Sequence, residues 1–173
     1  NDYLEDTIFC NDRSTVTFDS NKIGNNDYSS YGSLGYGNNN ILYGVAYRAW
    51  IYSKTPNPSL VCPQDNDKFT VDGKKGNGKL TYPVGLITSD EGVLSGFNTY
   101  SSNESDYLDI SNYLYTGINF WTFSAVGMNI NSSAAVGNIG SDGGIHGSYV
   151  FDAVGVRPVV SLASDTLVTG SGT

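Results

Sequence analysis

The sequence is poor in basic charge and in long apolar runs, and each shortage excludes a class of function. It has 9 Lys and Arg residues against 17 Asp and Glu residues, which gives a net charge of −8, and its longest basic cluster is Lys74–Lys75. An acidic surface repels a phosphate backbone, so we expect no nucleic-acid partner. No apolar run is long enough to cross a bilayer, so we expect no membrane insertion by this segment.

Histidine is also scarce, and no recognisable catalytic motif is present. His146 is the single histidine, it lies in a GGIHGS loop, and no GxSxG nucleophile motif is present. A lone histidine in a loop is more often a surface or ligand-contact residue than a general base. We therefore assign no catalytic residue and expect a protein that is not an enzyme.

Carboxylates occur in pairs, but no pair belongs to a complete metal-binding pattern. The run DNDKFTVDGKKG from Asp65 starts like a calcium loop. Phe69 stands at the third ligand position and Gly76 where the bidentate Glu belongs, so an EF-hand is excluded. A solvated turn is the favoured interpretation, and an irregular calcium site near Asp65 and Asp67 stays open as the alternative. We expect no other cofactor.

Cysteine is limited to Cys10 and Cys62, which lie in polar surroundings without a CxxC spacing or a nearby histidine cluster. A zinc site is therefore not expected. Two free thiols and a disulfide both stay open, and the disulfide is the favoured alternative. A disulfide that closes the loop from Cys10 to Cys62 contributes about 4 kcal/mol to stability in the chain-entropy model. Such a bond persists in an oxidising compartment, which favours an extracellular or cell-surface location.

Glycine, asparagine, serine and aromatic residues are abundant, whereas charged and helix-forming residues are few. Thirteen Tyr and an aromatic content of 13% provide the apolar surface that disordered chains lack, whereas 21 Gly and many Asn and Ser require much loop. We therefore expect one folded, β-rich and loop-heavy domain over residues 1–173, with abrupt ends that look like cuts in a longer protein.

Local patterns predict several short elements. Ser89 or Asp90 is expected to cap a short helix, Asp90–Leu94, in whose first turn Asp90 and Glu91 are favourable charges. Ile41–Tyr52 is the densest apolar segment, and a buried strand and a helical turn both stay open there. Strands are expected at Lys68–Val71, Leu80–Thr88, Phe120–Ser124, Tyr149–Ala153 and Val156–Leu162.

The stretch Tyr113–Leu162 organises the rest of the prediction. Its front carries six large apolar or aromatic side chains in eleven positions, and its back, Val154–Leu162, is rich in β-branched residues. Between them, Gly127–Gly147 is mostly Gly, Ser, Asn and Ala, with little that could build a core. A rigid frame with a small, polar, adaptable face is typical of a binding surface rather than of a catalytic centre.

Two residues of this stretch are predicted to be structural. Trp121 is expected in the core rather than stacked on a ligand. Arg157 lies between Val156 and Pro158 inside the β-branched run, and a charge buried there must be paired. We expect it to make an ion pair or a set of carbonyl contacts that pin the last strand.

Three segments of the same stretch, taken in order, resemble the C-terminal part of C-type-lectin-like domains: YLYTG at Tyr113–Gly117, FWTFS at Phe120–Ser124 and GVRPVVSL at Gly155–Leu162. The closer branch is the formylglycine-generating-enzyme-like one, which includes variable proteins altered by diversity-generating retroelements and related domains of bacterial surface proteins. YPVGLITSDE at Tyr82–Glu91 looks like the strand-to-helix step that precedes them. The likeness covers Leu80–Leu162.

The resemblance implies an α+β fold with a twisted antiparallel sheet, one or two short helices and much irregular loop, displayed on a bacterium or phage. It also implies variable contact residues between Ile118 and Asp152. The calcium-dependent sugar triplets of true lectins (EPN, QPD, WND) are absent, and so is the C-terminal cysteine pair that oxidises sulfatases. Neither of those activities therefore carries over.

The leading hypothesis is a surface-displayed ligand-binding or adhesion domain whose partner is another protein. One alternative is a structural module of a bacterial surface filament or stalk. Another is a calcium-independent carbohydrate-binding domain that uses exposed Tyr and Trp rings. The predicted contact residues are Asn119, Phe123, Met128, Asn129, Asn131, Asp142, His146 and Tyr149.

Overall fold

The computed structural model describes residues 3–15, 41–49, 56–73, 76, 78–97, 112–128 and 134–167. Over these residues the chain has a mixed α and β fold, with two short α-helices and several small sheets. The predicted α+β class is therefore confirmed. No helix in the described ranges is both long enough and apolar enough to serve as a membrane span.

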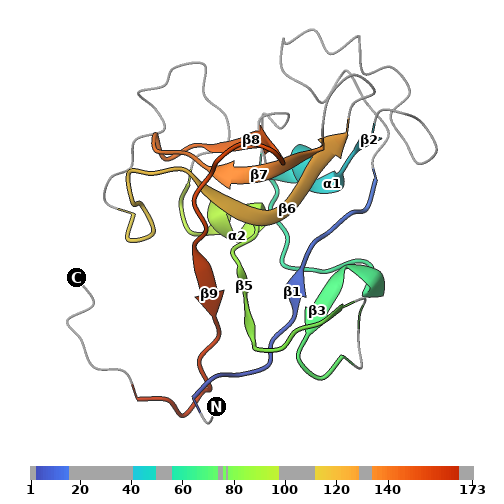
Figure 1. Cartoon of the computed structure of the whole chain (residues 1–173), viewed down its shortest axis with the longest axis vertical. Helices are drawn as coiled ribbons and strands as arrows, with labels where there is room; N and C mark the ends of the chain where they lie inside the picture. The colour runs from blue at the N-terminus through green and yellow to red at the C-terminus, as the bar shows by residue number, and fades with distance from the viewer. Residues whose placement is uncertain are drawn as a thin grey trace, which may run out of the picture.

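The largest sheet lies at one end of the molecule (Figure 1). Its four strands are β2 (Ile41–Leu42), β6 (Phe120–Met128), β7 (Ala135–Ile139) and β8 (Ile145–Tyr149), in that spatial order and all antiparallel. The register of β7 and β8 brings Ile139 opposite Ile145. Three of its four strands therefore come from the Tyr113–Leu162 stretch, and β7 and most of β8 come from the segment that was expected to be a polar face.

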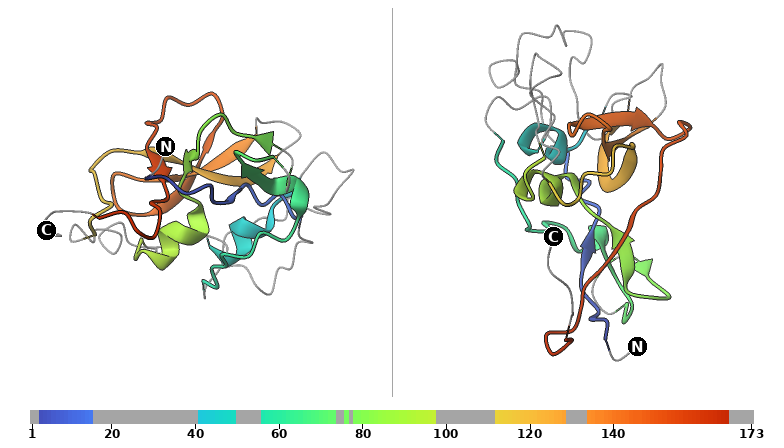
Figure 2. Two further views of the ribbon diagram at one scale, coloured as in Figure 1. Left: turned by 90° about the horizontal axis from the view of Figure 1, so that it is seen from below. Right: turned by 90° about the vertical axis from the view of Figure 1, so that its left-hand side faces the viewer.

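Both α-helices lie on one face of this sheet (Figure 2, right). They are α1 (Gly44–Arg48) and α2 (Ser89–Leu94). Thr88 caps α2, because its hydroxyl accepts a hydrogen bond from Glu91 N while the Glu91 carboxylate accepts one from Thr88 N. Such a reciprocal capping box satisfies two backbone donors that the first turn leaves open. The helix therefore begins close to its predicted start, with its cap one residue earlier than expected.

The core lies between the large sheet and the helices. Ile139 and Ile145 are fully buried there, and both lie 3.3 Å from where a Cβ on Gly92 of α2 would stand. Burial alternates along β6, as period-2 strand geometry requires when one face packs on the core. The core cluster is Ala46, Ile87, Phe97, Phe120, Val126, Ile139 and Ile145.

The expectation that Gly127–Gly147 contributes little to the core is therefore wrong. Ile139 and Ile145 are isolated apolar residues in the sequence, but the β7–β8 pairing places them side by side and turns them both inward. Gly137 and Gly140 of the same segment are also buried. The small residues around the two isoleucines let the hairpin pack closely rather than forming a loose face.

Strands at the other end of the molecule form two smaller sheets (Figure 1). β5 (Val84–Leu86) pairs with β9 (Pro158–Val160), and β1 (Phe9–Cys10) pairs with β3 (Lys68–Thr70), which pairs in turn with β4 (Gly78–Lys79). The 3-10 helix η3 (Asp65–Asp67) leads into β3. Near both chain ends, Leu4 bridges Leu162 in antiparallel fashion. The predicted disulfide between Cys10 and Cys62 is present, which is compatible with an oxidising, extracellular setting.

The predicted elements meet different outcomes. β3 confirms the strand at Lys68–Val71, and β5 and β9 are shorter than the strands expected around them. Ile41–Tyr52 contains both a strand and a helix, β2 and α1, so each open alternative holds for part of it. The strand predicted at Tyr149–Ala153 is wrong, because β8 ends at Tyr149 and the chain then turns.

Candidate functional site

Three predicted contact residues lie around the turn between β7 and β8. Asn119 Oδ1 accepts a hydrogen bond from Ser141 N at 2.7 Å. The Asp142 carboxylate oxygens lie 2.9 and 2.8 Å from His146 Nε2, and Gly144 N donates to Asp142 Oδ1. The side chains of Asp142 and His146 are 32% and 36% exposed, so this group is fixed yet open to solvent.

The charge state of Asp142 follows from these contacts. Burial alone would raise the pKa of the Asp142 carboxyl, but the hydrogen bond from Gly144 and the contact with His146 outweigh it and hold the pKa below its ordinary value. A fixed carboxylate beside an imidazole can accept hydrogen bonds from a partner. The same pair also holds the two side chains in one orientation.

Tyr149 lies at the other end of β8, on a turn of its own. Its ring stacks on that of Phe151, with 5.3 Å between ring centroids and 20° between ring planes. The two residues are 44% and 70% exposed, and Val150 between them is 55% exposed. Asp152 closes the turn: its N donates to the Tyr149 carbonyl, and its Oδ2 accepts from Tyr149 N, both at 2.8 Å. We call Tyr149–Asp152 the aromatic turn.

The remaining predicted contacts do not join either group. Phe123 is half-buried and packs edge-on against Phe69 of β3, with 5.4 Å between the rings. Met128 ends β6 opposite Ile41, and its side chain is outside the described part of the structure. Asn129 and Asn131 lie outside the described residues altogether.

Trp121 and Arg157, both predicted to be structural, lie near Phe120. Trp121 is half-buried, and alternation along β6 places it on the opposite face from Phe120 and the core cluster. Arg157 donates a hydrogen bond to the Leu114 carbonyl, and its guanidinium lies 5.4 Å from the centre of the Phe120 ring. This contact links the segment before β9 to the front of the Tyr113–Leu162 stretch.

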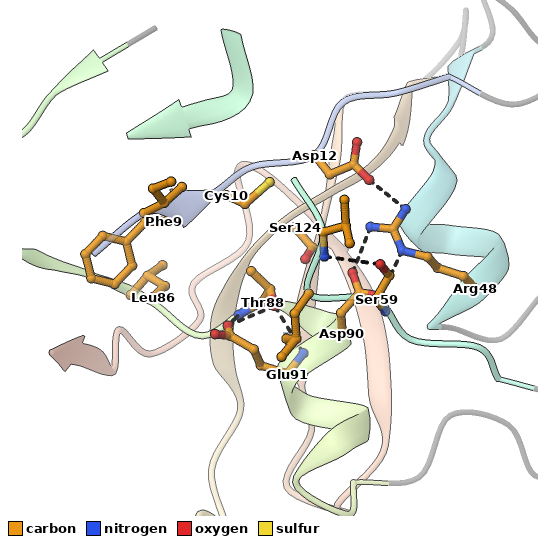
Figure 3. A pocket seen from close by; sticks show the side chains of 13 residues that line it. Phe9, Cys10, Asp12, Arg48, Ser59, Leu86, Thr88, Asp90, Glu91 and Ser124 are labelled. Atoms are coloured by element: carbon orange, nitrogen blue, oxygen red, sulfur yellow. Dashed lines mark hydrogen bonds and ion pairs between the residues drawn. The ribbon is translucent and has the colours of Figure 1, made fainter. Parts of the chain in front are cut away.

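An ion cluster that was not predicted from the sequence joins α1, α2 and the segment after β1 (Figure 3). Arg48 donates from Nε and Nη2 to the two carboxylate oxygens of Asp90, at 2.8 and 2.9 Å. Its Nη1 lies 2.6 Å from Asp12 Oδ2. Burial alone would lower the pKa of Arg48, but Asp90 and Asp12 outweigh it and raise the pKa above its ordinary value. Asp90 therefore neutralises a partly buried cation and also lies in the first turn of α2.

One sequence signal could have found this cluster. Arg48 lies inside the apolar run ILYGVAYRAWIY, just as Arg157 lies inside a β-branched run. A cation within such a run needs a carboxylate or carbonyl partner when the run is buried. That signal predicts a partner for Arg48, but it cannot say that Asp12 and Asp90, far away in sequence, supply it.

The cluster forms part of a pocket of about 240 Å³, here called the Arg48 pocket (Figure 3). Three exposed aliphatic residues line it: Ile8 at 48%, Leu60 at 70% and Val61 at 71%. The segment that carries Leu60 and Val61 is held on both sides, because Ser59 N donates to Asp90 Oδ1 and Cys62 is bonded to Cys10. The pocket thus combines charged groups with a fixed apolar edge.

The carboxylates considered for calcium are engaged by protein cations. Asp67 is fully buried and pairs with the Arg13 guanidinium at 2.7 Å, and Asp65 pairs with Lys68 at 2.6 Å. Among the described residues, no three His, Cys, Asp or Glu side chains are grouped to hold a metal ion.

Compared with protein-family models, with curated proteins and with solved structures, this chain matches none.

Proposed function

We propose that this chain is a non-enzymatic, surface-displayed domain that binds a protein partner. The aromatic turn carries the proposal, because the stacked rings of Tyr149 and Phe151 stay exposed on a turn that Asp152 holds from both sides. Aromatic side chains supply large contact areas and lose little conformational entropy when a partner covers them. Exposed rings that are already ordered therefore favour binding.

The polar group at the β7–β8 turn supports the same proposal. Asn119, Asp142 and His146 are oriented by hydrogen bonds within the domain, and they are at least partly exposed. Fixed polar groups near a rigid sheet give a partner hydrogen-bonding sites whose geometry is already set. β8 connects this group to the aromatic turn, so both belong to one structural unit.

The proposal includes the C-type-lectin-like fold of the formylglycine-generating-enzyme-like branch. The four-stranded antiparallel sheet, with the FWTFS segment in β6, and the separate pairing of β5 with β9, which contains the PVV of the RPVV segment, support it. So does the step from β5 into the capped helix α2. In this arrangement the β7–β8 turn and the aromatic turn form the binding face, and the buried parts of the 118–152 segment belong to its support.

Carbohydrate binding is the second candidate, because exposed flat rings also stack on sugars. Two arrays separate the two functions: secreted and cell-surface proteins on one, and glycans on the other. We expect the domain to bind a protein and not a glycan. Replacing both Tyr149→Ala and Phe151→Ala should weaken that binding at least about tenfold.

Tyr82→Ala is the matched control, because Tyr82 is 62% exposed and lies outside the aromatic turn. It should leave binding unchanged. Binding that survives the double substitution would contradict the placement of the contact face. Glycan binding that the double substitution removes, with no protein bound, would replace the protein-binding proposal with carbohydrate binding. No binding on either array would favour a structural module.

A further inference from the structure

We infer that the Arg48 pocket binds a lysine or arginine side chain of a partner polypeptide. The inference extends the proposed function, since it names the chemistry that a protein partner would present. The pocket lies between β1, the segment of residues 59–61, β5 and α2. It does not include any residue of the aromatic turn.

Charge selects the sign of the occupant. Three carboxylates, those of Asp12, Asp90 and Glu91, line the pocket together with the single guanidinium of Arg48, so negative charge is in excess. Arg48 is already bound by Asp90 through both carboxylate oxygens and touches Asp12, which leaves little attraction for an anion. The excess negative charge attracts a cation instead, and the acidic chain as a whole adds to this attraction.

One carboxylate oxygen of the pocket is open to a further hydrogen bond. Asp12 is only 5% exposed, and its Oδ2 lies 2.6 Å from Arg48 Nη1, so the guanidinium already compensates its charge. Glu91 is exposed, and its bonds with Thr88 N and Oγ1 both go to Oε2, which leaves Oε1 for a ligand. An exposed carboxylate oxygen of this kind can accept a charge-assisted hydrogen bond from a lysine or arginine side chain, directly or through water.

The apolar edge selects the shape of the occupant. Leu60, Val61 and Ile8 present aliphatic surface beside the carboxylates. Lysine and arginine have aliphatic stems that pack on such surface while the charged end stays with polar groups. The pocket volume of about 240 Å³ is below the range typical of drug-sized ligands, so one side chain suits it better than a cofactor.

The edge is also ordered before anything binds. The Ser59 hydrogen bond to Asp90 and the disulfide at Cys62 hold the backbone of Leu60 and Val61 in place from both neighbouring residues. A pre-organised surface loses less entropy on binding than a mobile one. The hydrogen bond from Ser59 N to Asp90 also connects the apolar edge to the ion cluster of Arg48.

The test is a titration of the isotope-labelled domain with capped pentapeptides Ala-Leu-X-Val-Ala, followed by NMR. X is lysine, arginine, norleucine or glutamate. The lysine or arginine peptide should shift the amide signals of Leu60, Val61 and Glu91 in a saturable way at concentrations up to about 5 mM. The norleucine peptide, which keeps the stem and lacks the charge, should bind roughly tenfold more weakly. The glutamate peptide should not bind.

Glu91→Gln sharpens the test, because Gln also completes a capping box and only the charge is lost. It should weaken binding of the lysine peptide about two- to fivefold. Glu5→Gln removes one charge outside the pocket lining and should change nothing. Equal affinity for lysine and norleucine peptides, shifts confined to other amides, or no saturable shift would each overturn the inference. Because the peptides probe the pocket alone, this result is independent of whether the aromatic turn binds a protein.

Discussion

Arg48 is the residue on which the buried charge of the helix side depends. Its guanidinium contacts Asp12 and Asp90, whose side chains are only 6% and 5% exposed. Removing one partner of a buried ion pair leaves a charge without compensation, which costs about 3–5 kcal/mol. We expect Arg48→Met to lower the free energy of unfolding in urea by that amount.

Lys68→Met is the control for that substitution. Its partner Asp65 is 82% exposed, so water compensates the carboxylate when the cation is lost. The expected loss is below about 1 kcal/mol. Similar losses for the two variants would show that the Arg48 cluster contributes no more than a surface pair.

The lowered pKa of Asp142 predicts that the stability of the fold depends on pH in the acid range. Because the folded protein holds the pKa of this carboxyl below its ordinary value of about 3.9, ionised Asp142 stabilises the fold. The contribution is complete above the ordinary pKa and is lost as the pH falls through the lower, folded pKa. The gain is modest, since the side chain is 32% exposed.

An NMR titration of the Asp142 carboxyl carbon measures this directly. We expect a midpoint below about 3.9 in the folded domain. The stability difference between the wild type and Asp142→Asn should shrink between about pH 4 and pH 2. A midpoint above the ordinary value would mean that burial outweighs Gly144 and His146.

At the scale of elements, the disulfide ties the segment that ends at Cys62 to β1 and so restrains the backbone of Leu60 and Val61. The disulfide to Cys10 closes a separation of 52 residues. In the chain-entropy model a bond of that span stabilises the folded state by about 4 kcal/mol. The variant Cys10→Ser/Cys62→Ser should lose about that much unfolding free energy.

Reductant provides the internal check for the disulfide. It should lower the stability of the wild type toward that of the double variant and leave the variant itself unchanged. Urea unfolding with and without reductant measures both. A wild type that is insensitive to reduction, once its thiols are shown to be free, would contradict a stabilising bond.

The β7–β8 hairpin depends on small residues at its contact with α2. A Cβ added at Gly137 would lie 2.5 Å from Ser89 Oγ and 2.6 Å from Thr122 Oγ1, which are hydrogen-bonded to each other at 3.1 Å. Overpacking of this kind costs about 1–3 kcal/mol. Gly137→Ala should therefore destabilise the domain in urea unfolding. Gly147→Ala, at the exposed position opposite it in the ladder, should be nearly neutral, and equal effects would contradict the packing argument.

The sequence predicted α2 well and the hairpin poorly, for physical reasons. Helix α2 depends on residues within one turn, Thr88 and Glu91, so its signal is local. Ile139 and Ile145 become core residues only when β7 pairs with β8, and neither lies in an apolar run. Tertiary pairing decided their burial, and composition alone suggested an exposed polar face.

On the scale of the whole molecule, composition predicted a β-rich, loop-heavy domain, the family resemblance implied the α+β class and the two cysteines suggested the disulfide, but none of these could arrange the site. Asn119, Asp142 and His146 come together because a turn joins two strands, whereas Tyr149 is carried to the far end of β8. The Arg48 pocket needed contacts between residues 12, 48 and 90, and no sequence spacing encodes such contacts. Distances of this kind follow from the fold.

Net charge supplies a prediction for the molecule as a whole. A domain with a charge of −8 attracts a cationic ligand through long-range forces that salt screens. Affinity for the lysine pentapeptide should fall roughly three- to tenfold between about 0.05 and 0.5 M NaCl. The norleucine peptide should show little change over the same range, and parallel changes for both peptides would point to a general salt effect.

The bridge between Leu4 and Leu162 has a mechanical consequence. Tyr3 and Ala163, then Glu5 and Ser161, are joined by backbone hydrogen bonds on either side of it, so the two strands run antiparallel with residues 3 and 163 at the same edge. If the chain were pulled from the ends next to residues 3 and 163, the force would break these hydrogen bonds one after another (unzipping) rather than load all of them at once in shear. The small ladder would peel open at low force, and the large sheet would carry load only afterwards.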